Sequence, residues 1–358
     1  MNVLPLFRSL SSCDYHRVIM PLKGMGIDAT QPVSTSYIQS LKDHPVIFFN
    51  RLPTEPVDSF LSNKKKIGFK YIVDLDDYFH LFPGHYLQYH WINNKIAESL
   101  IKIIQNADVV TTTNSVLADK ITEYNKNIVI IPNALPFDTD QFTLKNVGEL
   151  HGMTRFIYAA GASHAHDTMI LHEPLHLLNR VNKFDNHSLY EIKLAGVESI
   201  NPQHHAQWEY MQSIVSLDSN MTGNGYYRQA GAKPVMEYMS LYDNSDVALA
   251  PLQDNDFNRC KSNLKVLEAG AKGIPIITSA VHPYKNVTDS PNVEHAATPR
   301  EWFKLMKWMI ENPEYRREAG AYLAEHVRKH YHLKKVNEIR RQLFEYVAGE
   351  PLTNKIII

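Results

Sequence analysis

The sequence predicts an α/β protein built from two Rossmann-like, doubly wound domains that face a cleft, followed by C-terminal helices. Short runs of β-branched residues alternate with amphipathic stretches along the chain, which is the pattern of βαβ units with parallel sheets. A chain of 358 residues exceeds one ordinary hydrophobic core and suits two domains. Ligands of such sheets bind beyond the carboxyl ends of the strands, so we expect the functional residues there.

The first half of the chain contains four short apolar runs that we expect to be strands. They are Val46–Asn50, Lys70–Leu75, Asp108–Thr113 and Ile128–Ile131. Tyr89–Gln105 is expected to be one helix, because apolar residues recur there on a single helical face. This half therefore predicts one sheet with helices between its strands.

A segment rich in turn-forming residues separates the two halves. It contains Pro132 and Pro136 and continues as a polar stretch to about Met153. We therefore expect a first domain over residues 1–150 and a second over residues 151–335. A helix within residues 336–358 is expected to pack back toward the first domain.

The second half repeats the strand and helix pattern. Its expected strands are Arg155–Ala160, Tyr190–Ala195, Asp246–Ala250 and Ile274–Thr278. After Pro299 the chain becomes charged and helical, and the expected helices are Glu301–Asn312, Tyr315–Tyr331 and Leu333–Val347. The second half thus predicts a second sheet followed by terminal helices.

Composition argues against several classes of protein. The 37 basic and 38 acidic residues give a net charge of −1, whereas nucleic-acid-binding proteins usually carry a basic surplus. The only cysteines are Cys13 and Cys260, which predicts a reducing, cytoplasmic location without a disulfide framework. No apolar run approaches 18 residues, so we expect no signal peptide and no membrane-spanning helix.

The stretch from Ala250 to Pro275 carries the most chemical information. A strand is expected to end near Ala250 and a helix to run from about Lys261 to Gly273, with Lys265 and Glu268 on the same face as Lys261. A helix start with two lysines suits a diphosphate, and a carboxylate two turns further along could accept hydrogen bonds from ribose hydroxyls. The alternative is a surface helix with a Glu268–Lys272 ion pair.

This stretch resembles the donor-binding helix of retaining GT-B glycosyltransferases of the family 4-like, group 1 kind. The matching residues are Lys261-Ser-Asn-Leu-Lys-Val-Leu-Glu268 and the following Gly273-Ile-Pro275. The commonest members have two glutamates with seven residues between them, and Glu268 matches the second, which holds the donor ribose. Cys260 occupies the place of the first, so the chain resembles a variant with the pattern Lys-Ser-x-x-Lys-x-x-Glu.

Four other segments resemble the same family in the same order along the chain. Ile131–Asp138 is similar to the segment that closes the N-terminal domain, and Ala160–Asp167 is similar to the glycine-containing loop of the C-terminal domain. Tyr238–Pro251 is similar to the approach to the donor loop, and Tyr315–Tyr331 is similar to the closing helical region. The resemblance therefore extends over nearly the whole chain.

The resemblance implies a metal-independent reaction in which a sugar passes from a nucleoside-diphosphate sugar to an acceptor hydroxyl with retention of configuration. It implies an N-terminal acceptor domain, a C-terminal donor domain and no required cofactor. The implied catalytic residues are Asp76, Asp77 and Lys261, and the implied donor-binding residues are Gly161, Ser163, His164, Asp167, Arg259, Lys261, Ser262, Asn263, Lys265 and Glu268. Contacts to acceptor or phosphate are implied for Tyr15, His16, Arg17 and Arg51, with structural ion pairs as the alternative for both segments.

Several alternatives remain open at this point. The acceptor is expected to be a glycan or another soluble molecule, and a hydroxylated base in DNA, as for some bacteriophage enzymes, is the second possibility.

Two rival functions also remain. One is a magnesium-dependent phosphatase with Asp74 or Asp76 as its nucleophile, and the other is a non-catalytic nucleotide-sugar binder. Asp77 could be a simple helix cap. His164 and His166 have the spacing of some metal sites, but we expect them to contact phosphate or sugar. No Gly-x-Gly-x-x-Gly follows an early strand, which disfavours a nicotinamide-dependent oxidoreductase.

Overall fold

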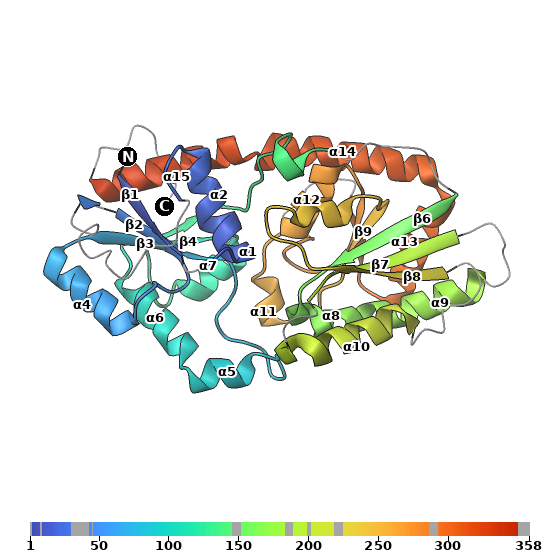
Figure 1. Ribbon diagram of the computed structural model, residues 1–358, viewed down its shortest axis with the longest axis horizontal. Coiled ribbons are helices and arrows are strands. Elements are labelled where there is room, and N and C mark those ends of the chain that lie inside the picture. The colour runs from blue at the N-terminus through green and yellow to red at the C-terminus, as the bar shows by residue number, and fades with distance from the viewer. Residues whose placement is uncertain are drawn as a thin grey trace. The chain divides into compact units, whose positions relative to one another are not determined.

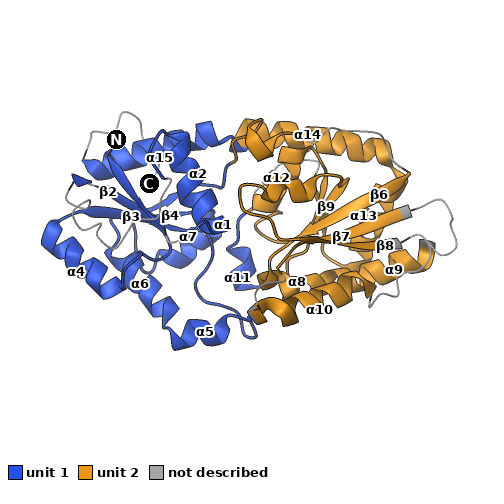
Figure 2. Cartoon of the chain, in the orientation of Figure 1, with its two compact units in different colours: residues 1–134, 255–262, 331–358 blue, residues 135–254, 263–330 orange. Residues whose placement is uncertain are grey.

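The computed structural model describes residues 2–7, 9–29, 43–44, 46–144, 152–182, 189–198, 202–217, 225–285 and 293–349 (Figure 1). The chain forms two compact units (Figure 2). Unit 1 contains residues 1–134, 255–262 and 331–358, and unit 2 contains residues 135–254 and 263–330. The first division falls near Pro132–Pro136, and the polar stretch expected to follow lies partly outside the described residues, as does the end of the expected C-terminal helix.

Within the described residues, the sheet of unit 1 has five parallel strands in the order in which they occur along the chain. They are β1 (Val3–Leu6), β2 (Val46–Asn50), β3 (Lys70–Leu75), β4 (Val109–Thr112) and β5 (Ile128–Ile130). In the register of the sheet, Asn50 lies beside Asp74, and Asp74 lies beside Thr111. Polar side chains from three strands therefore meet at the carboxyl edge of this sheet.

Helices cover both faces of the unit 1 sheet (Figure 1). Their bounds are α1 (Ser12–Asp14), a π-helical turn (Tyr15–Ile19), α2 (Met20–Gly24), α4 (Val57–Ile67), α5 (Gln88–Asn93), α6 (Ile96–Asn106), α7 (Ser115–Ile121), α11 (Asp256–Arg259) and α15 (Leu333–Ala348). Phe48 and Phe49 point to opposite faces of β2, since neighbouring strand residues alternate. Phe48 packs on Phe344 of α15, and Phe49 packs on Phe60 of α4, so α15 completes the second layer of this unit.

The sheet of unit 2 is doubly wound. Its described strands lie in the order β11-β10-β9-β6-β7-β8, all parallel, so the order reverses between β6 and β9. Their bounds are β6 (Met153–Ala159), β7 (Leu189–Val197), β8 (Gly225–Gly231), β9 (Val247–Ala250), β10 (Ile276–Ser279) and β11 (Val293–Ala296). In such sheets the crevice at the reversal, beyond the carboxyl ends of the strands, is where ligands bind.

The helices of unit 2 form two layers on its sheet. Their bounds are α8 (Ala165–Thr168), α9 (His172–Asn182), α10 (His205–Val215), α12 (Leu264–Lys272), α13 (Pro299–Glu311) and α14 (Pro313–Tyr331). Apolar residues of α9, α10 and α13 share one buried cluster with the strands. The helices α12 and α14 approach closely at Gly270, where a Cβ atom would lie 2.6 Å from a methyl group of Val327.

The structure confirms the expected α/β architecture and corrects some of its elements. The strands β1, β8 and β11 have no counterpart among the expected ones. The expected single helix Tyr89–Gln105 is wrong, because the chain breaks into α5 and α6 at Lys95, whose φ of 50° is left-handed. The expected helix start near Lys261 is also wrong, since α12 begins at Leu264. Among the described residues, no helix combines the length and apolarity that crossing a membrane requires.

Candidate functional site

Asp74 is the buried anchor of the carboxyl edge of unit 1. The side chains of Arg17 and Asp74 are each 1% exposed, and two guanidinium nitrogens donate to the carboxylate at 2.8 and 2.9 Å. Thr111 donates a further hydrogen bond of 2.6 Å. Burial alone would raise the pKa of Asp74, but the charge and hydrogen bonds of Arg17 and the Thr111 hydroxyl outweigh it and lower the pKa.

The Arg17–Asp74 pair is therefore structural, which was the alternative left open for the Tyr15–Arg17 segment. Arg17 also donates to Asn133 Oδ1 and to the carbonyl oxygen of Ile131, so its donors point into the protein. Tyr15 and His16 are buried in the same π-helical turn. Asp74 cannot be the nucleophile of a phosphatase, because its carboxylate is enclosed.

Asp76 and Asp77 follow β3 and are bridged by one arginine. Arg51 donates to Asp76 Oδ1 at 3.1 Å and to Asp77 Oδ2 at 2.9 Å, and both carboxylates remain partly exposed. Burial would raise the pKa of Asp76, but the charge of Arg51 outweighs it and the pKa is lowered. Arg51 itself has a left-handed φ of 62°, an uncommon conformation for a non-glycine residue that is often found at functional sites.

Residues 255–262 belong to unit 1 and end beside these aspartates. Lys261 Nζ lies 3.4 Å from Asp77 Oδ1. Asn114 donates to the carbonyl oxygens of Cys260 and Lys261, and Asn133 donates to Ser262 Oγ at 2.7 Å. These amides fix the backbone so that the Lys261 ammonium meets Asp77.

Cys260 occupies the place of the first glutamate of the common family pattern, and its side chain is fully buried. It belongs to the apolar cluster of unit 1 that contains Phe49 and Phe79. Arg259, which we expected to bind the donor, is about half exposed and lies 3.5 Å from Asp256. A glutamate at position 260 would place a carboxylate among these apolar side chains, away from solvent.

Glu268 is the central carboxylate of unit 2. It is 2% exposed, and its Oε2 accepts hydrogen bonds from the Tyr242 hydroxyl at 2.7 Å and from Lys265 Nζ at 2.9 Å. Lys265 also donates to the Tyr238 hydroxyl at 2.6 Å. Oε1 of Glu268 accepts no hydrogen bond from any residue that the structure describes, so both protein donors are on the other oxygen.

The ion pair of Glu268 is not the one given above as the alternative. A Glu268–Lys272 pair does not form, because Lys272 pairs with Asp243 at 3.1 Å and Lys265 pairs with Glu268. Burial alone would lower the pKa of Lys265, but Glu268 and Tyr238 outweigh it and raise the pKa. Lys265 is thus a permanent cation whose charge is directed at Glu268.

The loop after β6 carries a second organised pair. His164 Nδ1 lies 2.8 Å from Asp167 Oδ2, and Asp167 Oδ1 accepts the backbone N–H of Gln253 at 2.8 Å. Gln253 follows β9, so this contact joins the two loops on either side of the strand reversal. The neighbouring strand β7 requires a glycine at position 196. Gly196 has a φ of 93°, and a Cβ atom there would lie 2.6 Å from the carbonyl oxygen of Ala160.

The remaining expected donor residues lie near this pair or at the start of α12. Gly161 and Ser163 precede His164 in the same loop, and Asn263 is the residue before α12. No group of three or more histidine, cysteine or carboxylate side chains suited to a metal occurs among the residues described. Sequence reasoning did not assign Tyr238, Tyr242, Asn133 or Gln253, although two tyrosines four residues apart before a strand were a visible signal.

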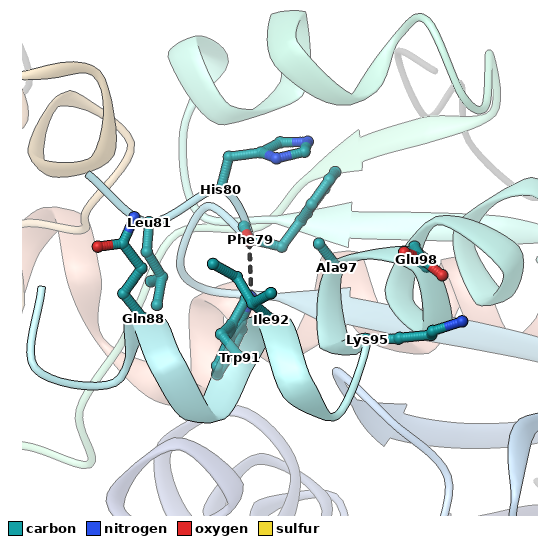
Figure 3. A pocket seen from close by; sticks show the side chains of 9 residues that line it. All are labelled: Phe79, His80, Leu81, Gln88, Trp91, Ile92, Lys95, Ala97 and Glu98. Carbon is teal, nitrogen blue, oxygen red and sulfur yellow. Dashed lines mark hydrogen bonds between the residues drawn. The ribbon is translucent and has the colours of Figure 1, made fainter. Parts of the chain in front are cut away.

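Each unit also has a cavity that was not expected. In unit 1 a cavity of about 230 Å³ lies between the Phe79–Leu81 segment and α5, with Trp91 Nε1 donating to the carbonyl oxygen of Phe79 (Figure 3). Gln88, Lys95 and Glu98 also line it (Figure 3). In unit 2 a cavity of about 580 Å³ lies at the carboxyl ends of β9, β10 and β11, with Gln253 and Trp302 in its wall.

Comparisons with known proteins agree with this architecture. A family model described as "Glycosyl transferase-like" matches residues 186–339, which is less than half of the chain. Among solved structures, a glycosyltransferase from Rickettsia africae has a TM-score of 0.64 at 11% identity, with 98% of this chain and 99% of that chain covered. Anabaena HepE in complex with UDP-glucose has a TM-score of 0.63 at 9% identity, with 96% and 99% covered. Sucrose-phosphate synthase from Thermosynechococcus elongatus has a TM-score of 0.61 at 12% identity, with 89% and 81% covered.

None of the curated proteins searched matches the sequence. At the low identities of the solved structures the likeness concerns the fold, and the chain has the α/β GT-B fold of these glycosyltransferases. The predicted fold class is therefore confirmed.

Proposed function

We propose that the protein is a retaining glycosyltransferase that moves a sugar from a nucleoside-diphosphate sugar to an acceptor hydroxyl without a metal ion. The GT-B fold and the family model over residues 186–339 support the reaction class. Anabaena HepE was solved with UDP and with UDP-glucose, which makes UDP-glucose the first donor to test. The acceptor we propose is a glycan or another soluble molecule with a hydroxyl group.

The observation that carries the proposal is the geometry of Glu268. Lys265 and Tyr242 hold Oε2, while Oε1 is left without a protein donor among the described residues. A carboxylate of this kind, near the carboxyl end of β9 in a doubly wound sheet, is suited to accept hydrogen bonds from the two hydroxyls of a ribose. Glu268 would thus fix the nucleoside, and the loop after β6 would meet the diphosphate.

The proposed roles in unit 1 concern the sugar and its departing phosphate. Lys261 would supply positive charge for the leaving diphosphate, and Asp76 or Asp77 would orient the sugar or the acceptor hydroxyl. Arg51 supports these roles, because it fixes both carboxylates while leaving them partly exposed. Ser262, held by Asn133, is a further hydroxyl for the phosphate.

The first experiment is donor hydrolysis without acceptor, since many transferases slowly pass the sugar to water. Purified protein is incubated with a panel of UDP- and GDP-sugars, with and without EDTA, and released nucleotide is measured. We expect slow release from one donor that EDTA does not reduce. Proton NMR of the product with an added acceptor would then report whether the anomeric configuration is kept.

Matched variants separate catalysis from binding and folding. Glu268→Ala is expected to abolish release, whereas Glu325→Ala, an exposed glutamate on α14, should leave it unchanged. Nucleotide binding without turnover on any donor and acceptor would instead favour the non-catalytic nucleotide-sugar binder. Turnover that stops with EDTA and returns with Mg²⁺ would contradict the metal-independent reaction.

A further inference from the structure

The break between α5 and α6 creates a cavity in unit 1. Lys95 has a left-handed φ of 50°, and because the helix is interrupted there, α5 lies against the segment that follows β3. The cavity between α5 and this segment has a volume of about 230 Å³ (Figure 3). Pockets that enclose a whole drug-sized ligand are larger, at about 300–1,000 Å³, so this cavity suits one ring-sized unit of a larger molecule.

The walls of this cavity are apolar and include a fixed indole ring. Trp91 and Ile92 of α5 line it together with Phe79 and Leu81 of the segment after β3 (Figure 3). An indole has one polar group, its N–H, and Trp91 donates it to the carbonyl oxygen of Phe79 at 2.8 Å. Trp91 therefore offers a ligand its apolar ring surface, held in one orientation. Such a surface suits a ligand that has an apolar face of its own.

The rim of the cavity is polar, and its charges cancel. Lys95 and Glu98 are exposed and contribute one charge of each sign. Oε1 of Gln88 accepts the backbone N–H of Gly84 at 3.0 Å, which leaves the amide nitrogen of Gln88 without a partner among the described residues. A few polar groups around an apolar wall are what fixes the orientation of a bound ligand. A pyranose ring matches this combination, because its C–H groups form an apolar face and its hydroxyls can both donate and accept.

The same rim argues against two other classes of ligand. A nucleic-acid strand stacks its bases on aromatic rings, but its phosphates also require a track of positive charge. Here Glu98 offsets the charge of Lys95. A lipid chain would cover the charged groups of the rim without forming hydrogen bonds to them, which costs free energy. A neutral ligand with many hydroxyls therefore fits the cavity better than either.

The cavity is close along the chain to the carboxylates that we propose orient the sugar or the acceptor. His80 lines the cavity and follows Asp77 by three positions, so their Cα atoms are at most about 11 Å apart. This segment is also rich in aromatic residues, since six of the residues 78–91 are Phe, Tyr or Trp, compared with 10% of the whole chain. Of these six, Phe79 is buried and the other five are partly or fully exposed. The segment therefore presents ring surfaces beside Asp77.

We propose that this cavity binds one sugar ring of an acceptor oligosaccharide, and that this ring is a neighbour of the sugar that reacts. The ring stacks on Trp91, Glu98 accepts hydrogen bonds from its hydroxyls, and the amide nitrogen of Gln88 donates to them. This inference rests on the proposed function and narrows the acceptor to an oligosaccharide or the end of a longer glycan. No bond is made or broken in the cavity.

The test begins with binding of the whole protein to a printed array of immobilised glycans, and the glycan bound best is then titrated by calorimetry. We expect the wild type to bind at least one glycan of the array. Trp91→Leu keeps an apolar side chain but removes the ring, and it should weaken binding about tenfold, whereas Trp91→Phe should weaken it about threefold. Glu98→Gln changes an exposed side chain, which does not endanger folding, and should weaken binding about fivefold.

A matched control and a kinetic measurement distinguish a ligand contact from a structural effect. Tyr89 lies on the same helix as Trp91, is 80% exposed and does not line the cavity, so Tyr89→Ala should bind the glycan like the wild type. In Trp91→Leu and Glu98→Gln, KM for the oligosaccharide acceptor should rise, while KM for the reacting sugar alone should stay that of the wild type. Thermal unfolding of each variant verifies folding.

The outcomes separate this inference from the proposed function. If the wild type hydrolyses a donor but binds no glycan of the array, the sugar site is wrong and the transferase proposal remains. The sugar site is also wrong if Trp91→Leu and Glu98→Gln both bind the glycan like the wild type, or if an oligothymidylate binds and Trp91→Leu weakens that binding instead. Glycan binding that both variants weaken, in a protein that hydrolyses no donor, would support the sugar site and overturn the proposed function.

Discussion

The carboxyl edges of the two sheets each contain a buried carboxylate paired with a cation, but the two pairs are built differently. In unit 1, Arg17 and Asp74 are both enclosed, and the surrounding Thr111 and Asn133 complete their hydrogen bonds. In unit 2, Glu268 is buried to the same degree, yet Lys265 and Tyr242 engage one oxygen and leave the other without a protein donor.

This difference is what we expect to separate an ion pair that only stabilises the fold from one that also binds a ligand. Burial and charge are shared by both pairs, so neither property identifies the functional residue. What differs is the hydrogen-bonding capacity that remains: Oε1 of Glu268 can still accept from a ligand or water, whereas Arg17 and Thr111 occupy both oxygens of Asp74. The closed pair should therefore govern stability, and the open pair should govern ligand binding.

The largest expected effect comes from breaking the closed pair. Arg17→Met leaves the Asp74 charge buried without its partner and should lower the free energy of unfolding by about 4 kcal/mol. Urea denaturation followed by circular dichroism measures this change. A loss below about 1 kcal/mol would mean that Asp74 is not the buried structural anion described above.

Arg340 provides a matched control for Arg17. It is also buried beside this pair, but its Nη2 has no partner among the described residues, and burial and the charge of Arg17 lower its pKa to about 9. Arg340→Met therefore removes a poorly satisfied cation and should change the free energy of unfolding by less than about 1 kcal/mol. Equal losses in the two variants would contradict the distinction.

The second effect concerns the residue that departs from the common family pattern. Cys260→Glu would insert a carboxylate into the apolar cluster of unit 1 and should cost about 3 kcal/mol of stability. Cys260→Ala, the control, should cost about 1 kcal/mol. A stable Cys260→Glu variant with faster donor hydrolysis would show that position 260 faces the donor after all.

The third effect tests the open oxygen of Glu268 directly. Wild-type protein should bind UDP about thirtyfold more tightly than 2′-deoxy-UDP. The deoxy nucleotide lacks the hydroxyl that would donate to the Glu268 carboxylate, so this charged acceptor is left without a donor. In Glu268→Gln this ratio should fall close to one, since the ionised acceptor is gone. Calorimetric titration with both nucleotides measures it, and an unchanged ratio would remove Glu268 from the ribose site. If GDP proves to be the matching nucleotide, GDP and 2′-deoxy-GDP take the place of the two uridine nucleotides.

Much of this architecture could be predicted from local sequence. The strands β2 and β3 were predicted with their observed bounds, because each is an apolar run with polar residues or proline beside it. The role of Glu268 as a ribose ligand was predicted from the resemblance of the Lys261–Pro275 stretch to the family, and it stays a prediction. Local patterns failed where the backbone changes conformation at single residues, as at Lys95 and before Leu264.

The partners of the buried ionic residues could not be predicted, because they are far apart in the chain. Arg17 meets Asp74 across 57 positions, and Tyr242 meets Glu268 across 26. Helical and strand periodicity report which face of an element is apolar, and they contain no information on which elements become neighbours. For the same reason the burial of Cys260 was not visible in a stretch that otherwise matched the family motif.

The smallest expected effect refines the open pair by comparing two tyrosines. Tyr242→Phe removes one of the two hydrogen bonds that hold Glu268 Oε2 and should raise KM for the donor about fivefold, with kcat changed less. Tyr238→Phe removes the hydrogen bond from Lys265 to the Tyr238 hydroxyl and leaves both donors to Glu268 Oε2 in place, so KM should change less than twofold. Steady-state kinetics of donor hydrolysis measures both variants. A larger effect of Tyr238→Phe on KM would mean that the donor requires a correctly positioned Lys265 ammonium rather than a correctly positioned Glu268 carboxylate. In that case the open oxygen of Glu268 does not bind the donor.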